Sequence, residues 1–402
     1  MQPDLKFPQQ FFWGCATSAH QIEGGLTNDW SEWEKSPARL KKLSDKKLNH
    51  FEFISGAAAN SFENNNADIA CMNEMNLNGY RFSIDWSRIE PENGKFNQEA
   101  LNYYLDFIKK LRAHHIEPFV TLWHWPLPIW LKNLGGWESK EIVKYFDRFA
   151  KIVATHLNSE VNFWTTLNEP TVYAGMSYLT GEWPPQKKNP LAYWNVLSNL
   201  IKAHRRVYCT LKSIDQNNQV GIANHLIYFE PYKNRLHNQL LKKIINWWMN
   251  ERFINKTKDY QDYIGLNYYF HHQINFGFHN NHKYEKSSDL DWGLHPEGIY
   301  HLLKELKKYN KPIYITENGL ADKGDQHRSW YIGEILKNVH RAIDEGVSVK
   351  GYFHWSLIDN FEWAYGIHPR FGLYEVNYQT FERRPRSSAQ YYADICKNNR
   401  VI

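Results

Sequence analysis

Two glutamates follow short apolar runs and have closely similar surroundings. Glu169 lies in the run Trp164–Pro170 (WTTLNEP), and Glu317 lies in the run Ile313–Gly319 (IYITENG). A single glutamate after a strand is usually a helix-start or surface residue. Two carboxyls with different protonation states can cleave a glycosidic bond, because the leaving oxygen needs a proton while positive charge develops on the sugar carbon. The pair is therefore the first candidate for a catalytic site.

Such a pair needs partners that set the two protonation states apart. Burial or a second negative charge keeps one carboxyl neutral, whereas a cation and hydrogen-bond donors keep the other ionised. Arg81, in the second β-rich run, is the available cation, and Tyr269, at the end of the sixth run, is a phenolic donor. These two side chains are the candidate partners of the ionised carboxylate.

The elements that must position these residues alternate between short β-rich runs and longer helical segments. The predicted strands are Phe11–Thr17, Gly79–Trp86, Pro118–Trp125, Val161–Leu167, Val220–Leu226, Tyr263–Tyr269, Pro312–Thr316 and Val349–Leu357. Between them, Leu101–Leu111 and Ile332–Ile343 carry apolar residues at helical spacing. No Pro- or Gly-rich linker divides the chain. The order favours an α/β fold of the (β/α)8 TIM barrel type over two separate α/β domains. Residues 1–402 would form a single catalytic domain.

Polar or aromatic residues follow nearly every predicted strand. They are His20-Gln21, Arg81 with Trp86, His124-Trp125, Asn168-Glu169, Asn224-His225, Asn267-Tyr268-Tyr269, Glu317-Asn318 and Trp355. In a TIM barrel the carboxyl ends of the strands form the active-site face. One polar strand end is an ordinary loop residue, but eight in succession predict a site. Glu169 and Glu317, at strands 4 and 7, would face each other across its mouth.

The composition limits the classes of function. The net charge is only +5, from 48 basic and 43 acidic residues, and the densest basic stretch, Lys35–Lys47, is interrupted by polar and apolar residues. We expect no nucleic acid and no membrane among the partners, since no apolar run is long enough to span a bilayer. The four cysteines are widely spaced, so we expect free thiols and no metal or other cofactor. Free thiols are typical of a reducing compartment, so we expect a cytoplasmic protein. The high aromatic content, 16%, suits both core packing and stacking on sugar rings.

The motifs around the two glutamates resemble those of glycoside hydrolase family 1, the β-glucosidase family. Thr166–Pro170 is similar to the acid/base motif of that family and Ile315–Gly319 to its nucleophile motif. The resemblance runs along almost the whole chain. It implies a retaining double displacement, with Glu169 as acid/base and Glu317 as nucleophile. Transition-state and nucleophile support would come from Asn168 (at the sugar 2-hydroxyl), Arg81, Tyr269 and Asn267.

The same resemblance implies a set of sugar-binding residues. Gln21 would bind the 3- and 4-hydroxyls, His124 and Trp125 would line the pocket near the 3-hydroxyl, and Trp292 would mark the entrance of the leaving-group subsite. Trp355 would form the floor under the sugar, Glu362 would bind the 4- and 6-hydroxyls, Trp363 the 3-hydroxyl, and Phe371 would also contact substrate. A carboxylate at Glu362 would repel a 6-phosphate, so an unphosphorylated glycone is expected.

Some positions depart from the pattern of that family. His20 replaces a common Tyr, Pro126 a usual Asp, and Tyr365 a frequent acidic residue. The chain is also shorter than usual at Asn28–Phe53 and Tyr228–Gln261, from which we expect a more open mouth or a gap filled by an unfamiliar arrangement. These departures affect the rim and therefore substrate preference.

The resulting hypothesis is an exo-β-glycosidase of small-molecule β-glycosides or oligosaccharides. It would act on β-glucosides, with β-galactosides, β-fucosides or β-mannosides as further substrates. The alternative is a catalytically silent sugar-binding protein on the same fold, against which the presence of both carboxylates argues. The oligomeric state is open.

Overall fold

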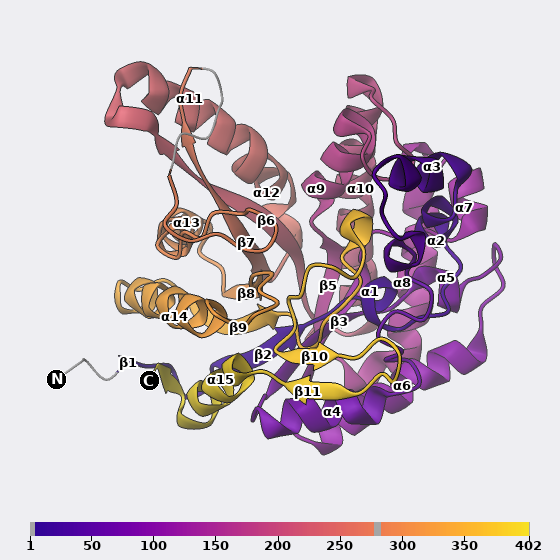
Figure 1. Ribbon diagram of the computed structural model, residues 1–402. Coiled ribbons are helices and arrows are strands. Elements are labelled where there is room, and N and C mark those ends of the chain that lie inside the picture. Colours follow the sequence, from indigo (N-terminus) through magenta and orange to yellow (C-terminus); the bar gives the residue numbers. More distant parts are fainter. Residues whose placement is uncertain (1–4, 277–282, 402) are drawn as a thin grey trace.

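The fold is a closed barrel of eight parallel strands with helices around it (Figure 1). The computed structural model describes residues 5–276 and 283–401. The barrel strands, in order of neighbours, are β2 (Phe12–Ala16), β3 (Gly79–Ser83), β4 (Glu117–Trp123), β5 (Phe163–Asn168), β6 (Gln219–Pro231), β7 (Tyr263–Ile274), β8 (Ile313–Asn318) and β9 (Val349–Trp355). The predicted (β/α)8 barrel is thereby confirmed.

Helices follow each strand and cover the outside of the barrel. The longer ones are α4 (Asn65–Glu74), α6 (Gln98–Ala113), α8 (Ile142–Leu157), α10 (Pro190–Ile214), α11 (Leu236–Asn246), α13 (Gly298–Leu306), α14 (Arg328–Asp344) and α15 (Ser387–Asn398). Short helices lie in the loops: α1 (Ala19–Ile22), α2 (Asp29–Glu34), α3 (Pro37–Asp45), α5 (Trp86–Ile89), α7 (Ile129–Asn133), α9 (Pro170–Gly175) and α12 (Arg252–Thr257). No helix among the described residues is long and apolar enough to cross a bilayer.

Two small antiparallel ladders complete the fold. Strand β1 (Leu5–Lys6) pairs with β12 (Arg400–Val401), which ties the two ends of the described chain together. Strand β10 (Tyr374–Val376) pairs with β11 (Arg383–Pro385) after the last barrel strand.

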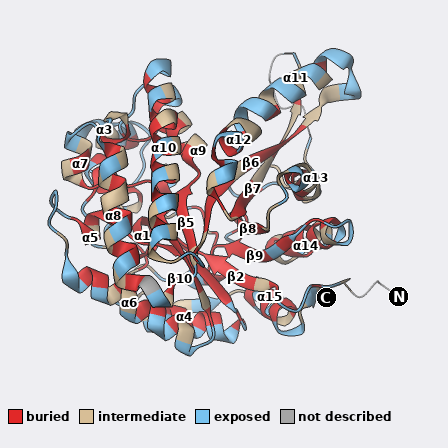
Figure 2. Cartoon of the chain, turned by 180° about the vertical axis from the view of Figure 1, so that it is seen from behind, coloured by how far each residue is buried: buried red, intermediate tan, exposed pale blue. Residues whose placement is uncertain are grey.

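The core has two layers, one inside the barrel and one between strands and helices. Inside, aromatic rings from several strands pack together, including Phe119 against Phe163 at a centroid distance of 4.2 Å and Phe119 against Phe353 at 4.6 Å. Gly14 makes room for this packing, because a Cβ at that position would lie 2.5 Å from Phe353. The outer layer consists of the apolar faces of the helices, and the exposed faces point outward (Figure 2). A filled barrel bottom leaves the opposite, carboxyl end as the place for a site.

The largest differences from the predicted elements concern β6 and β7. Both strands continue past the predicted ends at Leu226 and Tyr269 and pair with each other as far as Pro231 and Ile274. These arms form a small apolar cluster of their own with the inner face of α11, in which Ile227 and Phe229 are buried. The pairing of β6 with β7 continues beyond the barrel because α11 covers these extended strands. The predicted strand Gly79–Trp86 was too long, since Trp86 begins α5.

Candidate active site

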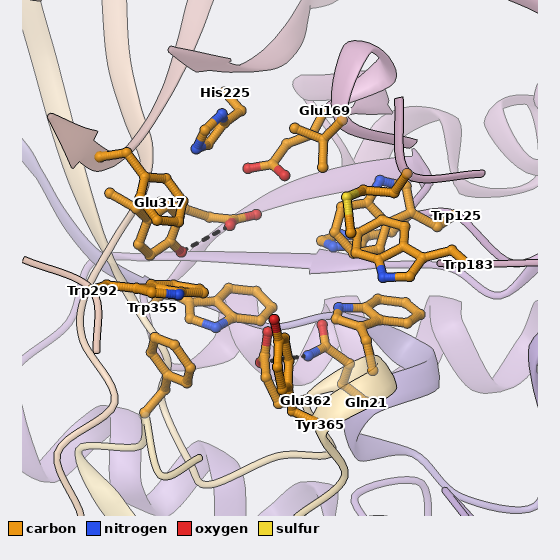
Figure 3. A pocket seen from close by; sticks show the side chains of 17 residues that line it. Gln21, Trp125, Glu169, Trp183, His225, Trp292, Glu317, Trp355, Glu362 and Tyr365 are labelled. Carbon is orange, nitrogen blue, oxygen red and sulfur yellow. Dashed lines mark hydrogen bonds between the residues drawn. The ribbon is translucent and has the colours of Figure 1, made fainter. Parts of the chain in front are cut away.

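The carboxyl ends of the barrel strands surround one cavity of about 240 Å³. Its walls carry carboxylates, polar side chains and many aromatic rings (Figure 3). The lining residues are Gln21, His124, Trp125, Glu169, Val172, Met176, Trp183, His225, Tyr269, Phe270, Trp292, Glu317, Trp355, Glu362, Trp363, Tyr365 and Phe371.

Glu317, at the end of β8, is held by a cation and a phenol. Nη1 of Arg81 donates to Oε1 at 2.5 Å, and the hydroxyl of Tyr269 donates to Oε2 at 3.0 Å. Arg81 is completely buried on β3 and also donates from Nε to the Thr121 hydroxyl. A buried guanidinium fixed in this way is a rigid counter-charge, and it favours the ionised form of Glu317.

Glu169, on the opposite side, has a weaker set of partners. Nδ2 of Asn267 donates to its Oε1 at 2.8 Å, and Asn267 is itself oriented by the Thr316 hydroxyl, which donates to its Oδ1 at 2.6 Å. No lysine or arginine within the described chain makes an ion pair with Glu169. Asn168, next to it, accepts from Nη2 of Arg81 at 2.7 Å. The two carboxyls therefore stand in unequal surroundings, linked by Arg81 and the two asparagines.

The backbone at Glu169 explains how the carboxyl reaches the cavity. Glu169 has φ +43°, in the left-handed region, directly between β5 and α9. Pro170 then starts α9 as its first residue, a position that suits the fixed φ of proline. Trp125 and Trp363 also have positive φ. Non-glycine residues in this region carry strain and tend to occur at functional sites, and all three line the same cavity.

Burial controls the proton affinities of the two carboxyls. Removal from water raises the pKa of Glu169 and of Glu317 to about 7. At Glu317 the charge of Arg81, with hydrogen bonds from Arg81 and Tyr269, opposes this rise, whereas the charge of Glu169 adds to it. Because the guanidinium touches Glu317 directly, we expect the proton that the pair retains to lie on Glu169.

The end of the cavity away from Glu169 carries hydrogen-bonding groups beside aromatic faces. Nε2 of Gln21 donates to Asn360 at 2.9 Å and to Oε2 of Glu362 at 3.2 Å. Burial and the charge of Glu317 raise the pKa of Glu362 to about 8. Nε2 of His124 accepts from Asn168 at 3.0 Å, and its Nδ1 has no partner in the described chain. Such a buried, unpaired nitrogen is suited to a ligand hydroxyl.

Three tryptophans shape this end of the cavity. Trp363 lies nearly parallel to His20 and to His124, with interplanar angles of 12° and 14°. Nε1 of Trp125 donates to the Asn168 carbonyl at 3.0 Å, which fixes its ring against Trp363. Trp355, at the end of β9, supplies another buried face. Flat apolar faces next to a few polar groups are the usual composition of a sugar pocket.

The match to known proteins decides the family. Residues 4–263 and 236–401 match the sequence profile of glycosyl hydrolase family 1. The chain belongs to glycosyl hydrolase family 1. It is 32% identical to β-glucosidase A of Thermotoga maritima, over 98% of this chain and 98% of that protein.

Solved structures agree with this assignment. The β-glucosidase of Thermotoga maritima in complex with glucoimidazole has a TM-score of 0.91 and 31% identity, covering 98% of this chain and 99% of that chain. A β-glycosidase from Pyrococcus horikoshii has a TM-score of 0.89 and 36% identity, covering 100% of this chain and 97% of that chain. As a family 1 member the protein is a glycoside hydrolase.

Most of the site residues predicted from the sequence of this family 1 protein line the cavity. They are Gln21, His124, Trp125, Glu169, Tyr269, Trp292, Glu317, Trp355, Glu362, Trp363 and Phe371. Of the other three, Arg81 donates to Glu317 and Asn267 donates to Glu169, while Asn168 accepts from both Arg81 and Asn267. Their individual roles stay predictions.

Several wall residues were not among the predicted site residues. Val172 lies on α9, three residues after Glu169. Met176 begins the π-helical turn that follows (Met176–Thr180), seven residues after Glu169, so both side chains face the cavity. His225 comes from β6, Phe270 from the arm of β7 beyond Tyr269, and Trp183 from the loop before α10. His225 could have been selected, because it stands at a predicted strand end. Burial lowers its pKa to about 4, so its ring is neutral near pH 7.

Proposed function

We propose that the protein is a retaining exo-β-glycosidase that hydrolyses unphosphorylated β-glycosides, β-glucosides first among them. The observation that carries the proposal is the unequal pair at opposite strand ends. Glu317 is in contact with Arg81 and Tyr269, and Glu169 has a single amide donor. That asymmetry supports a nucleophile and a proton donor within one cavity.

In the first step, Glu317 attacks the anomeric carbon while Glu169 gives its proton to the leaving oxygen. The carbon–oxygen bond to the aglycone breaks, and a glycosyl ester of Glu317 forms on the opposite face of the ring. The positive charge that develops on the sugar is stabilised by the remaining carboxylate charge, and Arg81 and Tyr269 keep the attacking oxygens in place.

In the second step, water enters from the side that the aglycone has left. Glu169, now ionised, takes a proton from that water, whose oxygen bonds to the anomeric carbon as the ester bond breaks. Esterification removes the negative charge of Glu317, which had raised the proton affinity of its neighbour, so Glu169 changes from acid to base without any movement. Two inversions restore the β configuration.

The polar end of the cavity supports recognition of one terminal sugar. Gln21 and Glu362 are hydrogen-bonded to each other at the closed end, where the 4- and 6-hydroxyls of a glycone would lie. Both side chains can contact a hydroxyl of either configuration, which supports galacto-, fuco- and manno-configured substrates beside glucosides. A phosphate would meet the carboxyl of Glu362 with no described basic side chain in the cavity wall to neutralise it.

We also propose that residues 1–402 act as one catalytic domain in a reducing compartment, the cytoplasm. All four cysteines are unpaired thiols, and Cys15, Cys71 and Cys396 are buried. Disulfides would be the expected state of neighbouring cysteines in an oxidising compartment.

Stereochemical rescue by azide tests the two roles. Glu317→Ala should lose hydrolysis of aryl β-glucosides, and azide should restore turnover with an α-glycosyl azide as product, because azide replaces the nucleophile. Glu169→Ala is the matched variant: with an aryl glucoside that has a good leaving group, azide should give the β-glycosyl azide, because it intercepts the ester. NMR of the products distinguishes the anomers. A β product from Glu317→Ala, or an α product from Glu169→Ala, would refute the assignment.

A further inference from the structure

Helix α11 and the turn after it expose an apolar stripe. Leu236, Leu240, Ile244 and Trp247 recur at intervals of four, four and three residues, which puts them on one side of the helix. Their exposed fractions are 83%, 60%, 53% and 49%. Trp248 and Met249 continue the exposed apolar surface. We call these six residues the α11 stripe; none of them is buried within residues 5–276 or 283–401, although Trp248 packs one edge against Trp194.

The opposite side of α11 and of the turn after it packs against the protein through buried asparagines as well as through Leu241 and Ile245. Nδ2 of Asn238 donates to the Tyr232 carbonyl at 2.7 Å, and Asn250 bonds both the amide and the carbonyl of Ile227. An ordinary surface helix buries its apolar side and exposes its polar side. Helix α11 packs only Leu241 and Ile245 inward beside its buried asparagines and leaves Leu236, Leu240 and Ile244 exposed. The stripe is therefore apolar surface in excess of what the fold covers, and it is suited to an apolar partner.

The charges on α11 and the turns beside it are mostly basic. Residues 231–250 contain four basic residues and no Asp or Glu. Of the four, Lys242 faces Glu305 at 3.7 Å, while Lys233, Arg235 and Lys243 are exposed. The whole chain, by contrast, has nearly balanced charge. Near Trp247 the only acidic side chains are Glu251 and Glu305, which are paired with Lys308 and Lys242 within the described chain. Exposed Leu and Trp beside unpaired basic side chains are the composition of a helix that lies in the interface of an anionic bilayer.

We propose that α11 binds the protein to the surface of membranes that contain anionic lipids. The stripe would enter the headgroup boundary, and Lys233, Arg235 and Lys243 would contact lipid phosphates and carboxylates. Such a helix lies along the surface, so the proposal agrees with the lack of a membrane-crossing helix among the described residues. It departs from the sequence-based expectation that membranes are not among the partners.

A second copy of the chain fits this face less well than a bilayer does. A two-fold contact through α11 would bring Lys233, Arg235 and Lys243 of both copies together, and like charges repel. The helix has 11 residues and is therefore about 16 Å long. One face of that length is small beside the roughly 800 Å² per partner that stable interfaces bury.

The position of α11 connects this surface with the active site. The helix packs on the ends of β6 and β7, which extend from the carboxyl face of the barrel (Figure 1). Its inner residues Leu241 and Ile245 contact the cluster that includes Phe270, and Phe270 lines the catalytic cavity. A bilayer bound at α11 would lie at the rim that carries the cavity.

Co-sedimentation with vesicles tests the proposal on the full-length protein. Vesicles of phosphatidylcholine alone are compared with an equimolar mixture of phosphatidylcholine and phosphatidylserine. We expect binding to the mixture, weaker binding at high salt, and little binding to phosphatidylcholine alone. Each basic side chain near an anionic surface strengthens binding about fivefold. The triple variant Lys233→Gln, Arg235→Gln, Lys243→Gln should thus bind roughly one hundredfold more weakly.

Matched variants separate the stripe from general surface effects. Leu236→Ser with Leu240→Ser should abolish binding, whereas Phe51→Ser with Leu134→Ser, two exposed residues outside α11, should leave it unchanged. Lys41→Gln, Lys42→Gln and Lys46→Gln on and beside α3 control for the loss of three charges. Hydrolysis of a soluble aryl glucoside should be normal in all of them, which shows that they are folded.

Any of three results would overturn the proposal. The first is failure of the wild-type protein to sediment with the mixed vesicles, and the second is equal sedimentation of the Leu236/Leu240 variant. The third is a concentration-dependent dimer in analytical ultracentrifugation that the same variant abolishes, without vesicle binding, which would assign the stripe to a second copy.

Discussion

Arg81 provides the sharpest test of how the site keeps its two glutamates different. Its guanidinium is buried and lies 2.5 Å from Oε1 of Glu317. An opposite charge at such a distance lowers a carboxyl pKa by about 1 to 3. Arg81→Met should therefore raise the pKa of Glu317 from about 7 by a similar amount. Since only the ionised form attacks the sugar, kcat/KM at pH 6 should fall roughly 10- to 1,000-fold.

The pH profile of aryl glucoside hydrolysis measures this change. Activity rises with pH as the nucleophile ionises, so the acid limb of kcat/KM should move to higher pH in Arg81→Met. Arg81→Lys keeps a positive charge and should move the limb less. Thr121→Val removes only the oxygen that accepts from Nε of Arg81 and should barely move it. An unchanged acid limb in a folded Arg81→Met protein would refute the electrostatic role assigned to this residue.

Stability provides a second measurement on the same variant. Removing one partner of a buried ion pair costs about 3–5 kcal/mol when the other remains charged. A carboxyl whose folded pKa lies above its unfolded value contributes stability at low pH and loses it as the pH rises through the folded pKa. The melting temperature of Arg81→Met should therefore approach that of the wild type near pH 4 and fall increasingly below it toward pH 8.

Three further predictions follow from the cavity. Glu169→Ala should lower kcat/KM about 10²- to 10⁴-fold for alkyl glucosides but far less for dinitrophenyl glucosides, which leave without a proton; equal losses would contradict the acid role. Glu362→Gln should raise the free energy of unfolding by at most about 5 kcal/mol at pH 8 and not at pH 4, because the folded pKa of Glu362 is raised from 4.5 to about 8. The activity of Glu362→Gln should fall. If its melting temperature at pH 8 is no higher than that of the wild type, burial does not raise the pKa of Glu362. His225→Phe should reduce kcat/KM for oligosaccharides about fivefold, which corresponds to the free energy of one hydrogen bond, about 1 kcal/mol. Glucosyl fluoride, which lacks an aglycone, should be unaffected, and an equal loss on both would exclude a role toward the aglycone.

The barrel could be predicted because its strands are short apolar runs with polar ends. Each predicted run overlaps an observed barrel strand, and the helical spacing at Leu101–Leu111 and Ile332–Ile343 corresponds to α6 and α14. The arms of β6 and β7 beyond Leu226 and Tyr269 could not be predicted. They depend on pairing with each other and on the cover of α11, which are contacts between segments distant in sequence.

The two carboxyls and their motifs were visible in the sequence, whereas the far wall of the cavity was not. Met176 begins a π-helical turn, and that turn changes which side chains after Glu169 face the cavity. Trp183 lies in an irregular segment, for which no periodicity indicates a direction. Local motifs fix where a strand ends, but long-range packing decides which loop residues close the pocket.

The charges in the cavity suggest why the site tolerates three carboxyls, two of them buried and one half-buried, with one buried cation. Glu169, Glu317 and Glu362 all have raised pKa values, and Arg81 is the guanidinium that contacts one of them. In the protein without substrate, these carboxyls lower the free energy of unfolding above pH 7, because burial disfavours their ionised forms. When the bond to the aglycone breaks, the sugar becomes cationic in the same enclosed space. The ionised carboxylate of Glu317, which is already in place, then stabilises the transition state without reorganisation. The carboxyl groups that weaken the fold at neutral pH are thus the ones that would lower the barrier, and Glu362→Gln should show both effects with opposite signs.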